Sequence, residues 1–516
     1  MLLKVHSASV LGIQAQMVDV EVDISASDRM LYHVVGLPDT AIKESGKRVQ
    51  AAIRNCGFAY PNRGSITVNL APADFKKEGS CYDLPIALAV MGITGALQPE
   101  RLRNWLILGE LSLDGQVRPI RGALPVTLSA RRHRFQKVLL PADNAHEAAV
   151  VDSVSVYAAH SLPQVVHLLD GGAEEYPPLK VDPARLMAEV RTGLPDFADV
   201  KGQQGVKRAL EVSCAGGHNL LMIGPPGAGK TMLARRIPSI LPGLEFAEAL
   251  ETTAIHSVAG LLGADRQFVT HRPFRAPHHT ISAAGMVGGG STPRPGEVSL
   301  AHKGVLFLDE LPEFKRHVLE VLRQPLEEKE ITISRAAGTL TFPADFMLVT
   351  AMNPCPCGYF GSLLKECVCT PPLIHRYLNK ISGPLLDRID IHIEVPEVKY
   401  YELTRNSSSE PSTAIAKRVL SARQIQLRRF KKSATVFCNA QMGPVEIREY
   451  CQLSKATREL LEKAIVQLGF SARAYDRILK VSRTIADLAG AEEILGEHVS
   501  EAVQYRTLDR KFWDSF

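Results

Sequence analysis

A glycine-rich segment in the middle of the chain has the residues that bind a nucleoside triphosphate. It fits the pattern G-x-x-x-x-G-K-[ST], follows the apolar run 220–223 and precedes the helical run 232–236. Glycines let backbone N–H groups surround the β-phosphate, and the start of a helix adds positive potential. We expect the lysine to reach the β- and γ-phosphates and the threonine hydroxyl to bind Mg²⁺, so the segment predicts ATP and Mg²⁺ as cofactors. The segment comprises Gly224, Pro225, Pro226, Gly227, Ala228, Gly229, Lys230 and Thr231.

Two carboxylates follow a second apolar strand further along the chain. Asp309 and Glu310 end the run that starts at Gly304. We expect Asp309 to hold Mg²⁺ and Glu310 to polarise the attacking water, because phosphoryl transfer depends on positioning and on stabilisation of charge. The next apolar strand, 346–352, ends at Asn353, which would place an amide beside the γ-phosphate. Together with the phosphate loop, these residues predict ATP hydrolysis.

Four of the nine cysteines lie close together directly after Asn353. Four thiolates suit tetrahedral Zn²⁺, although the C-x-C spacing is less diagnostic than C-x-x-C. The chain can chelate an ion if it turns at Pro356 and Gly358. We prefer a structural zinc ion that pins this segment, and ordinary reduced cysteines or a reversible redox pair are the alternatives. The four residues are Cys355, Cys357, Cys367 and Cys369.

Residues 417–432 carry seven positive charges and no acid. Their apolar members give a partly buried face, so the segment is predicted to be an amphipathic helix. A basic stripe favours DNA phosphates through counterion release. It could equally pair with acids on an adjacent subunit or be solvated. The apolar members are Val419, Leu420, Leu427 and Phe430.

Three regions of the chain differ in pattern. The first begins with strand-like alternation, in which Val18, Val20, Val22 and Ile24 point to one side and acidic residues to the other. In the second, short apolar strands alternate with longer stretches, which is typical of a parallel α/β sheet. The third is predicted to be helical to its end. The predicted divisions are 1–172, a linker at 173–195, 196–396 and 397–516.

Composition excludes several classes of protein. With 45% hydrophobic and 22% charged residues, the 516-residue chain is not largely disordered. No apolar run approaches the length needed to cross a bilayer, and no signal-type segment is present, so we expect a cytoplasmic protein without membrane contact. Nine cysteines are too few for a disulfide scaffold of this length. A net charge of +5 neither requires nor excludes nucleic acid.

Several short segments around these residues form a family pattern. They are Asp199-Val-Lys-Gly-Gln203, Gly217-His-Asn219, Phe307-Leu-Asp-Glu-Leu-Pro-Glu313, Ala351-Met-Asn-Pro354 and Gly383-Pro-Leu-Leu-Asp-Arg-Ile-Asp390. With the phosphate loop, they resemble AAA+ ATPases of the magnesium-chelatase-like group, and the resemblance covers essentially the whole chain. More narrowly, the chain is similar to the ComM/YifB branch, whose members carry an extra N-terminal domain. That branch implies a hexameric DNA helicase that promotes branch migration when bacteria integrate transforming DNA.

The resemblance assigns roles to three further residues. Asn353 takes the sensor-1 place, and Arg388 resembles the arginine finger, which reaches the γ-phosphate bound in the neighbouring subunit. Arg473, at the start of a lid helix, resembles the sensor-2 arginine. A finger supplied by a neighbour implies a homo-oligomer, expected to be a hexamer. The alternatives are an ion pair of Arg388 with Asp387 or Asp390, and a plain surface charge at Arg473.

Two further segments resemble the elements that project toward the pore in this clade. The glycine-rich run 281–290 resembles the helix-2 insert. Within 331–342, two strands flank a short glycine-containing link and predict a hairpin, which matches the pre-sensor-1 hairpin. Basic residues here could contact DNA phosphates or be solvated. The candidate DNA contacts are Arg335 near the hairpin tip and, more weakly, Arg294 and Lys303.

The N-terminal region resembles a Lon-protease-type domain without its catalytic pair. Residues 109–122 resemble the closing segment of that domain, and 77–79 resemble the stretch before its nucleophile. Peptidase chemistry there needs a serine with a lysine general base. Cys81 falls where the serine belongs and Leu124 where the lysine belongs, so we expect a non-proteolytic scaffold that binds DNA or stabilises the ring.

The resemblance therefore implies an α/β multidomain protein. It would have a Lon-protease-like α+β domain, a central AAA+ P-loop ATPase built on a parallel sheet and a C-terminal helical lid. The expected function is an ATP-driven motor acting on single-stranded, duplex or branched DNA. The alternatives are a chelatase-like or chaperone-like remodeller of a protein partner and an ATP-dependent protease, and the missing Ser/Lys pair argues against the protease.

Overall fold

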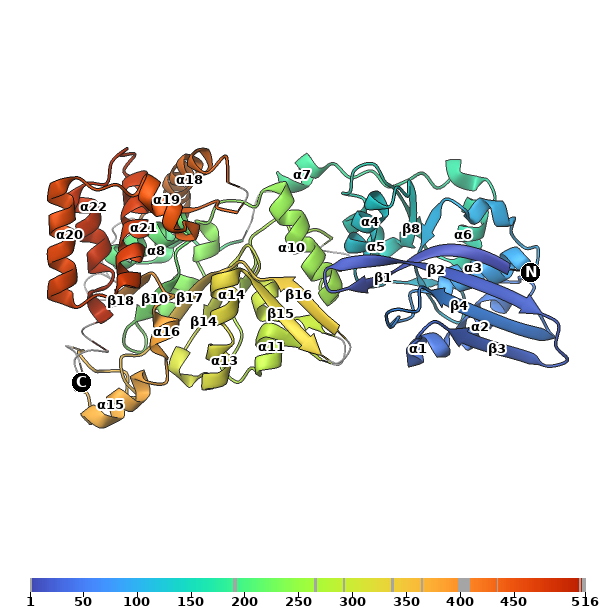
Figure 1. Ribbon diagram of the computed structural model, residues 1–516, viewed down its shortest axis with the longest axis horizontal. Helices are drawn as coiled ribbons and strands as arrows, with labels where there is room; N and C mark the ends of the chain where they lie inside the picture. The colour runs from blue at the N-terminus through green and yellow to red at the C-terminus, as the bar shows by residue number, and fades with distance from the viewer. Residues whose placement is uncertain are drawn as a thin grey trace.

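The computed structural model describes residues 2–188, 193–263, 267–290, 293–335, 338–362, 365–397, 409–433, 435–509 and 512. The molecule is elongated, with the N-terminal region at one end and the central sheet with the C-terminal helices at the other (Figure 1). No described helix is both long enough and apolar enough to span a membrane.

The N-terminal region is built on a seven-stranded sheet of order β3-β4-β2-β1-β5-β8-β9. The alternation in β2 places Val18, Val20 and Val22 in the core, as predicted. Antiparallel pairing joins β1, β2 and β4, whereas β5, β8 and β9 pair in parallel. The strands are β1 (Leu2–Leu11), β2 (Gln14–Ser25), β3 (Met30–Val35), β4 (Gly64–Ala71), β5 (Trp105–Ile107), β8 (Lys137–Pro141) and β9 (Ser155–Ala159), with the small pair β6 (Glu110–Leu111) and β7 (Val117–Arg118).

Helices pack on this sheet and complete an α+β unit. Helix α3 is apolar on all sides and almost wholly buried, which is typical of a helix in the middle of a core. The helices are α1 (Thr40–Lys43), α2 (Ser45–Asn55), α3 (Asp83–Ile93), α4 (Ala123–Arg132), α5 (Ala142–Ala148) and α6 (Leu162–Leu169), followed by the short α7 (Pro183–Met187).

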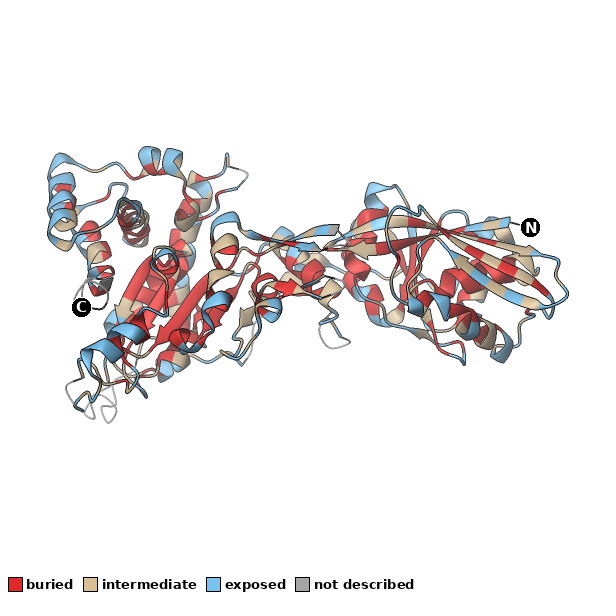
Figure 2. Ribbon diagram, turned by 60° about the horizontal axis from the view of Figure 1, so that its bottom comes forward, coloured by how far each residue is buried: buried red, intermediate tan, exposed pale blue. Residues whose placement is uncertain are grey.

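The central region is built on a five-stranded parallel sheet of order β11-β14-β17-β10-β18. Strands β10, β14 and β17 are buried along their whole length, because helices and other elements cover both faces (Figure 2). The strands are β10 (Leu220–Ile223), β11 (Phe274–Arg275), β14 (Val305–Leu308), β17 (Met347–Met352) and β18 (Ile391–Glu394). The helices are α8 (Gln204–Gly216), α9 (Lys230–Ala234), α10 (Phe246–Ala259), α12 (Glu297–Leu300), α13 (Arg316–Glu320), α14 (Arg323–Glu328), α15 (Pro371–Leu378) and α16 (Gly383–Leu386).

Two small hairpin-like elements extend from the central region. Helix α11 (Ala283–Val287) leads into the pair β12 (Gly288–Gly289) and β13 (Arg294–Pro295). The predicted pair of strands around the 335–338 link is present as β15 (Glu330–Arg335) and β16 (Gly338–Pro343), in antiparallel register. The two elements are in contact, since a Cβ added at Gly288 would lie 2.9 Å from the Ile333 side chain.

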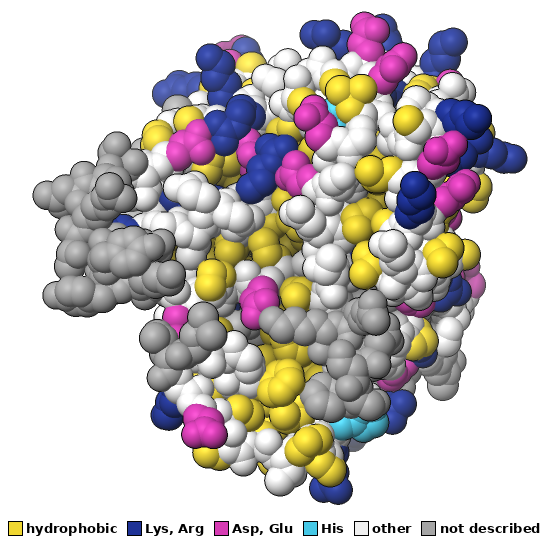
Figure 3. All heavy atoms as spheres, turned by 90° about the vertical axis from the view of Figure 1, so that its left-hand side faces the viewer, with side chains coloured by type: hydrophobic (Ala, Val, Ile, Leu, Met, Phe, Trp, Pro, Cys, Tyr) yellow, Lys and Arg dark blue, Asp and Glu magenta, His cyan; other side chains and the backbone are white. Residues whose placement is uncertain are grey.

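The C-terminal region is helical, as predicted. Helix α21 packs on α8, α18 and α22, and all of its residues from Val481 to Asp487 are buried, so its second half is enclosed on every side. On the end of the molecule that α20 and α22 form, acidic and basic side chains are interspersed in the described part of the surface (Figure 3). The helices are α18 (Ser412–Arg429), α19 (Pro444–Tyr450), α20 (Lys455–Leu468), α21 (Ala472–Leu488), α22 (Gly496–Gln504) and α23 (Thr507–Asp509).

A separate apolar cluster joins the N-terminal and central regions. Leu124 of α4 and Val150 pack in it with Leu244 and Ala249 of the central region. Helix α4 also begins against α10, where the Gly122 N–H donates to the Ser257 carbonyl over 3.2 Å. The two regions are thus held together by buried apolar side chains as well as by the chain connection.

Candidate nucleotide-binding site

The predicted phosphate-binding groups meet at one edge of the central sheet. In a parallel sheet the carboxyl ends of all strands lie at the same edge. The phosphate loop follows β10, Asp309 follows β14 and Asn353 follows β17, and these three strands are neighbours. The topology therefore brings together residues that lie far apart in the sequence.

The phosphate loop has the backbone shape that its glycines permit. Gly227 and Gly229 have φ values of +79° and +86°, a region that other residues rarely adopt. A side chain at Gly224 would meet the Val395 carbonyl at 2.3 Å. The Gln203 amide, from the predicted 199–203 segment, donates to the Ala228 carbonyl over 2.8 Å and so braces the loop from outside.

Lys230 is buried inside this loop. Its ammonium donates to the Gly224 carbonyl (2.6 Å), the Pro225 carbonyl (2.9 Å) and Asn353 Oδ1 (3.1 Å). Burial lowers its pKa to about 8, although Asp309 and Glu310 oppose this shift. The lysine is held at the position where the β- and γ-phosphates are expected, and Asn353 lies beside it.

Thr231 and Asp309 also lie together, as a shared Mg²⁺ shell requires. The Thr231 hydroxyl donates to Asp309 Oδ2 over 2.5 Å. A hydroxyl and a carboxylate are oxygen ligands of the kind that Mg²⁺ prefers, and Mg²⁺ is usually held by one or two such groups plus phosphate oxygens. The residues present therefore fit the metal.

Glu310 has a partner that sequence analysis missed. It is the residue after Asp309, has φ +52° and is mostly exposed. Its carboxylate lies 3.4 Å from His279 Nδ1, and the His279 ring packs against His278 and Phe314. The adjacent histidines at 278 and 279 were a visible signal in the sequence, but nothing in their spacing tied them to a carboxylate after another strand.

Arg388 and Arg473 lie at the opposite edge of the same sheet. The Asp390 N–H donates to the Asn219 carbonyl, directly before β10 begins, whereas the phosphate loop starts directly after β10 ends. The length of β10, about 13 Å at 3.3 Å per residue, therefore separates the backbone beside Arg388 from the phosphate loop of its own chain. Arg473 lies on the same side, because it contacts Asp387 over 3.4 Å.

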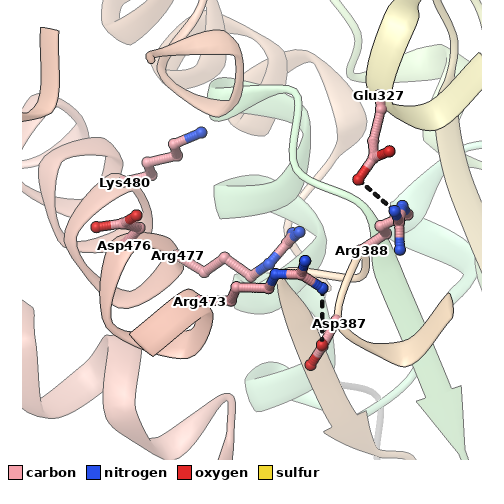
Figure 4. Close-up of a pocket in the computed structure, with 7 residues that line it drawn as sticks. All are labelled: Glu327, Asp387, Arg388, Arg473, Asp476, Arg477 and Lys480. Atoms are coloured by element: carbon pink, nitrogen blue, oxygen red, sulfur yellow. Dashed lines mark hydrogen bonds and ion pairs between the residues drawn. The ribbon is translucent and has the colours of Figure 1, made fainter. Parts of the chain in front are cut away.

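The two arginines line a polar cavity of about 200 Å³ between the central sheet and α21 (Figure 4). Arg388 pairs with Glu327 of α14, not with the neighbouring aspartates that we considered as alternatives. The exposed Arg473 lies 3.4 Å from Asp387. The lining residues are Glu327, Asp387, Arg388, Arg473, Asp476, Arg477 and Lys480.

A buried polar network fixes α21 beside this cavity. Asp390 pairs with Arg477 and lies 3.2 Å from His218 Nδ1, while His218 Nε2 lies 2.8 Å from the Thr484 hydroxyl. Burial opposes ionisation of Asp390, but Arg477 and His218 lower its pKa well below the ordinary value. Sequence analysis did not identify Arg477, because its partner lies in another region of the chain.

Among the predicted DNA contacts, Lys303 is corrected by the structure. Its ammonium is mostly buried and pairs with Asp345 Oδ2 over 2.9 Å, so it is not available to a DNA phosphate. Arg294 in β13 is exposed, and its role as a DNA contact stays a prediction. Arg335 ends β15, and its side chain lies outside what the structure describes, so its role stays a prediction.

The basic segment 417–432 forms most of α18, but acids of the same chain neutralise part of it. Arg429 binds Asp487 through both terminal nitrogens, at 2.8 and 2.5 Å. Arg418 pairs with Glu211 and Glu410.

The prediction of the apolar face of this segment is wrong at one residue, because Leu420 is exposed. The buried residues of α18 are Ser412, Ile415, Val419, Ala422 and Gln426.

The four clustered cysteines converge. Their sulfurs all lie within 4.8 Å of one another, and they form the one such metal-ligand group among the residues that the structure describes. Burial opposes ionisation of Cys357, but hydrogen bonds from the Tyr359 N–H and the Cys355 thiol lower its pKa to about 6. Since the thiolate is the metal-binding form, the cluster is compatible with Zn²⁺.

In the N-terminal region, Cys81 lacks the setting of a nucleophile. Its surroundings raise the pKa of the thiol to about 12, mainly by desolvation and also through Asp83. Leu124, where the general base would belong, is buried in the apolar cluster that joins the two regions. The loss of peptidase chemistry in this region stays a prediction.

Comparison with known proteins places the whole chain in one family. The profile of magnesium chelatase subunit ChlI matches residues 196–403, that of its C-terminal part matches 409–506, and a further ChlI profile matches 20–144.

The chain is 44% identical over 511 residues to competence protein ComM of Haemophilus influenzae, covering 98% of this chain and 97% of that protein. It is 43% identical over 507 residues to the uncharacterized protein YifB of Escherichia coli, with the same coverage. Magnesium-chelatase subunit ChlI of Porphyra purpurea is 23% identical over 232 residues, 40% of this chain and 58% of that protein. The match to magnesium-chelatase-like AAA+ proteins implies an ATPase that uses ATP and Mg²⁺, and the chain belongs to the ComM/YifB family of that group.

Proposed function

We propose that the protein is an ATP-dependent DNA motor of the ComM type, a ring helicase that promotes branch migration during homologous recombination and natural transformation. One observation carries the motor part of this proposal. The chain presents Lys230, Asp309 and Glu310 at one edge of its sheet and Arg388 and Arg473 at the other.

That division supports an active site shared between subunits. Arg388 and Arg473 lie too far from their own phosphate loop, so they would contribute to a γ-phosphate bound by a neighbouring copy. An arginine supplied in this way stabilises the charge that develops in phosphoryl transfer. Repeated around a closed ring, which we take to be a hexamer, the same contact would complete every site.

Within one site, each residue would have a separate task. Lys230 would bind the β- and γ-phosphates, and Thr231 and Asp309 would hold Mg²⁺. Glu310 would orient and deprotonate the attacking water, and Asn353 would position it near the γ-phosphate. Hydrolysis would then be coupled to movement of β15–β16 and of the β12–β13 insert, which contact each other.

The support for DNA as the partner is the family relationship together with these two projecting elements. A motor that binds the phosphates of the DNA backbone can act on DNA of any sequence, as branch migration requires. The test is the steady-state ATPase rate with single-stranded, duplex and four-way-junction DNA, with Glu310→Gln as the control. We expect DNA to stimulate a rate that the control lacks, and branch migration of a labelled junction in the presence of ATP.

A second function is a remodeller of a protein partner. It is favoured by the pairing of Lys303 with Asp345 and of α18 arginines with Glu211 and Asp487, which leaves fewer free cations than the sequence suggested. An ATPase rate that polypeptide stimulates and DNA does not would establish this function in place of the first.

A further inference from the structure

The four thiols after β17 have the spacing of ligands around one ion. The sulfur of Cys355 lies 3.3 Å from that of Cys357 and 3.7 Å from that of Cys367, and the last two are 3.6 Å apart. With Zn–S bonds of about 2.3 Å, the sulfurs of a tetrahedral site lie about 3.8 Å apart. A disulfide requires about 2.05 Å, so these distances match shared coordination and not a covalent pair.

The backbone around the first pair supports bound thiolates. The Phe360 N–H donates to the Cys355 sulfur over 3.3 Å, and the Gly358 N–H donates to the Cys355 carbonyl over 2.9 Å. Gly358 has φ +87°, which lets the chain reverse directly after Cys357. Four sulfur ligands leave no open position, which is typical of a structural and not a catalytic zinc.

This turn lies directly against the nucleotide site. A Cβ added at Gly358 would lie 2.5 Å from Pro226 Cδ in the phosphate loop and 3.8 Å from Asn353 Cγ. Asn353 in turn accepts the hydrogen bond from Lys230. The cysteine turn is therefore in van der Waals contact with the loop that would hold the phosphates.

We propose that Cys355, Cys357, Cys367 and Cys369 bind one structural Zn²⁺, and that this ion holds the Gly358 turn against Pro226 and so keeps the phosphate loop and Asn353 in their binding geometry. Without the ion, nothing links the four neighbouring thiols, and the Gly358 turn is no longer held against Pro226. Nucleotide affinity should then fall although no phosphate-binding residue has changed. The inference rests on the nucleotide site and is independent of DNA.

The metal is tested first, without nucleotide or DNA. The full-length chain is purified without added metal and its zinc measured by mass spectrometry, beside Cys367→Ser/Cys369→Ser and the control Cys56→Ser, a cysteine in the N-terminal region. We expect one zinc per chain in the wild type and control and none in the double variant. Replacement by Co²⁺ should give the absorption of a tetrahedral tetrathiolate. A wild type without zinc, or with these cysteines as disulfides by mass spectrometry, would overturn the site.

The coupling is tested on the wild-type chain, so that misfolding of a variant cannot decide the result. The protein is stripped with a chelator, returned to Mg²⁺ with or without one equivalent of Zn²⁺, and checked by circular dichroism. We expect the Kd for a fluorescent ADP analogue to rise about tenfold on stripping, within the range found for coupled sites, and to recover with Zn²⁺. An unchanged Kd in a folded, zinc-free chain would refute the coupling. Loss of DNA stimulation alone would bear on the proposed function and not on this inference.

Discussion

The ammonium of Lys230 donates a hydrogen bond to Asn353 Oδ1 over 3.1 Å. The bond joins the end of β10 to the end of β17, so the phosphate loop and the sensor position form one unit before any nucleotide arrives. The same lysine also holds two carbonyls of its own loop. Nucleotide binding would exchange these neutral partners for phosphate oxygens.

Nucleotide affinity should depend on pH through Lys230. Burial lowers its pKa in the free protein to about 8, and bound phosphates favour the charged ammonium. Binding therefore takes up a proton above pH 8. We expect ADP affinity to be constant below that value and to fall about tenfold per pH unit above it.

The measurement is a titration with a fluorescent ADP analogue across this range. In Lys230→Arg the guanidinium stays charged, so any remaining affinity should lose this dependence. A wild-type affinity that is flat up to about pH 10 would contradict the assignment.

Replacement of His279 should release Glu310. His279 Nδ1 lies 3.4 Å from the Glu310 carboxylate. This contact restricts the orientation of Glu310, the proposed general base. We expect His279→Ala to raise the basal ATPase rate several-fold while the ratio of DNA-stimulated to basal rate falls. His278→Ala is the matched control, because His278 packs on His279 without an ion pair to Glu310. A basal rate that falls as in Glu310→Gln would instead place His279 in the hydrolysis step.

Subunit mixing should reveal the shared active site. Arg388→Ala alone is expected to lower the ATPase rate by about 10³-fold or more, the scale of an arginine finger. Lys230→Ala should be inactive through loss of nucleotide binding. Because each variant lacks a different half of the site, mixed rings should recover measurable activity at interfaces with two intact halves. Mixtures no more active than the separate variants, in verified mixed oligomers, would argue against supply from a neighbour.

Lys303 and Arg294 should behave differently when replaced by alanine. Lys303 is one side of a mostly buried ion pair with Asp345, to which Lys329 also pairs, so Lys303→Ala should lower the free energy of unfolding by about 1–3 kcal/mol. Arg294 is exposed, so Arg294→Ala should leave stability unchanged and weaken DNA binding. Denaturant unfolding and DNA binding at fixed salt would measure both. If the Lys303→Ala protein were as stable as the wild type but bound DNA less tightly, Lys303 would be a DNA contact after all.

The phosphate site was predictable because its information is local. Gly227 and Gly229 supply positive φ values, and Lys230 and Thr231 follow at the start of a helix, all within one short segment. Asp309 and Asn353 directly follow apolar strands, and parallel pairing alone brings such strand ends together. The cysteine cluster was visible for the same reason, since its members lie in one short stretch of chain.

The partners of the charged side chains were decided by tertiary structure. Lys303 and Arg294 are both single basic residues in the sequence, yet the first is paired with Asp345 and the second is exposed. The seven charges of 417–432 look free in the sequence, but Asp487 of another helix neutralises Arg429. Likewise, nothing in the sequence placed Gly358 against Pro226 or His279 beside Glu310.

The sequence by itself determined which backbone turns and strand ends could form a nucleotide site, because those requirements act between neighbouring residues. Only the tertiary structure decided that Arg388 and Arg473 lie at the far edge of the sheet from Lys230. The physical reason is that ion pairing and distance depend on how helices and strands far apart in the chain pack together, and the local pattern of residues does not encode that packing directly.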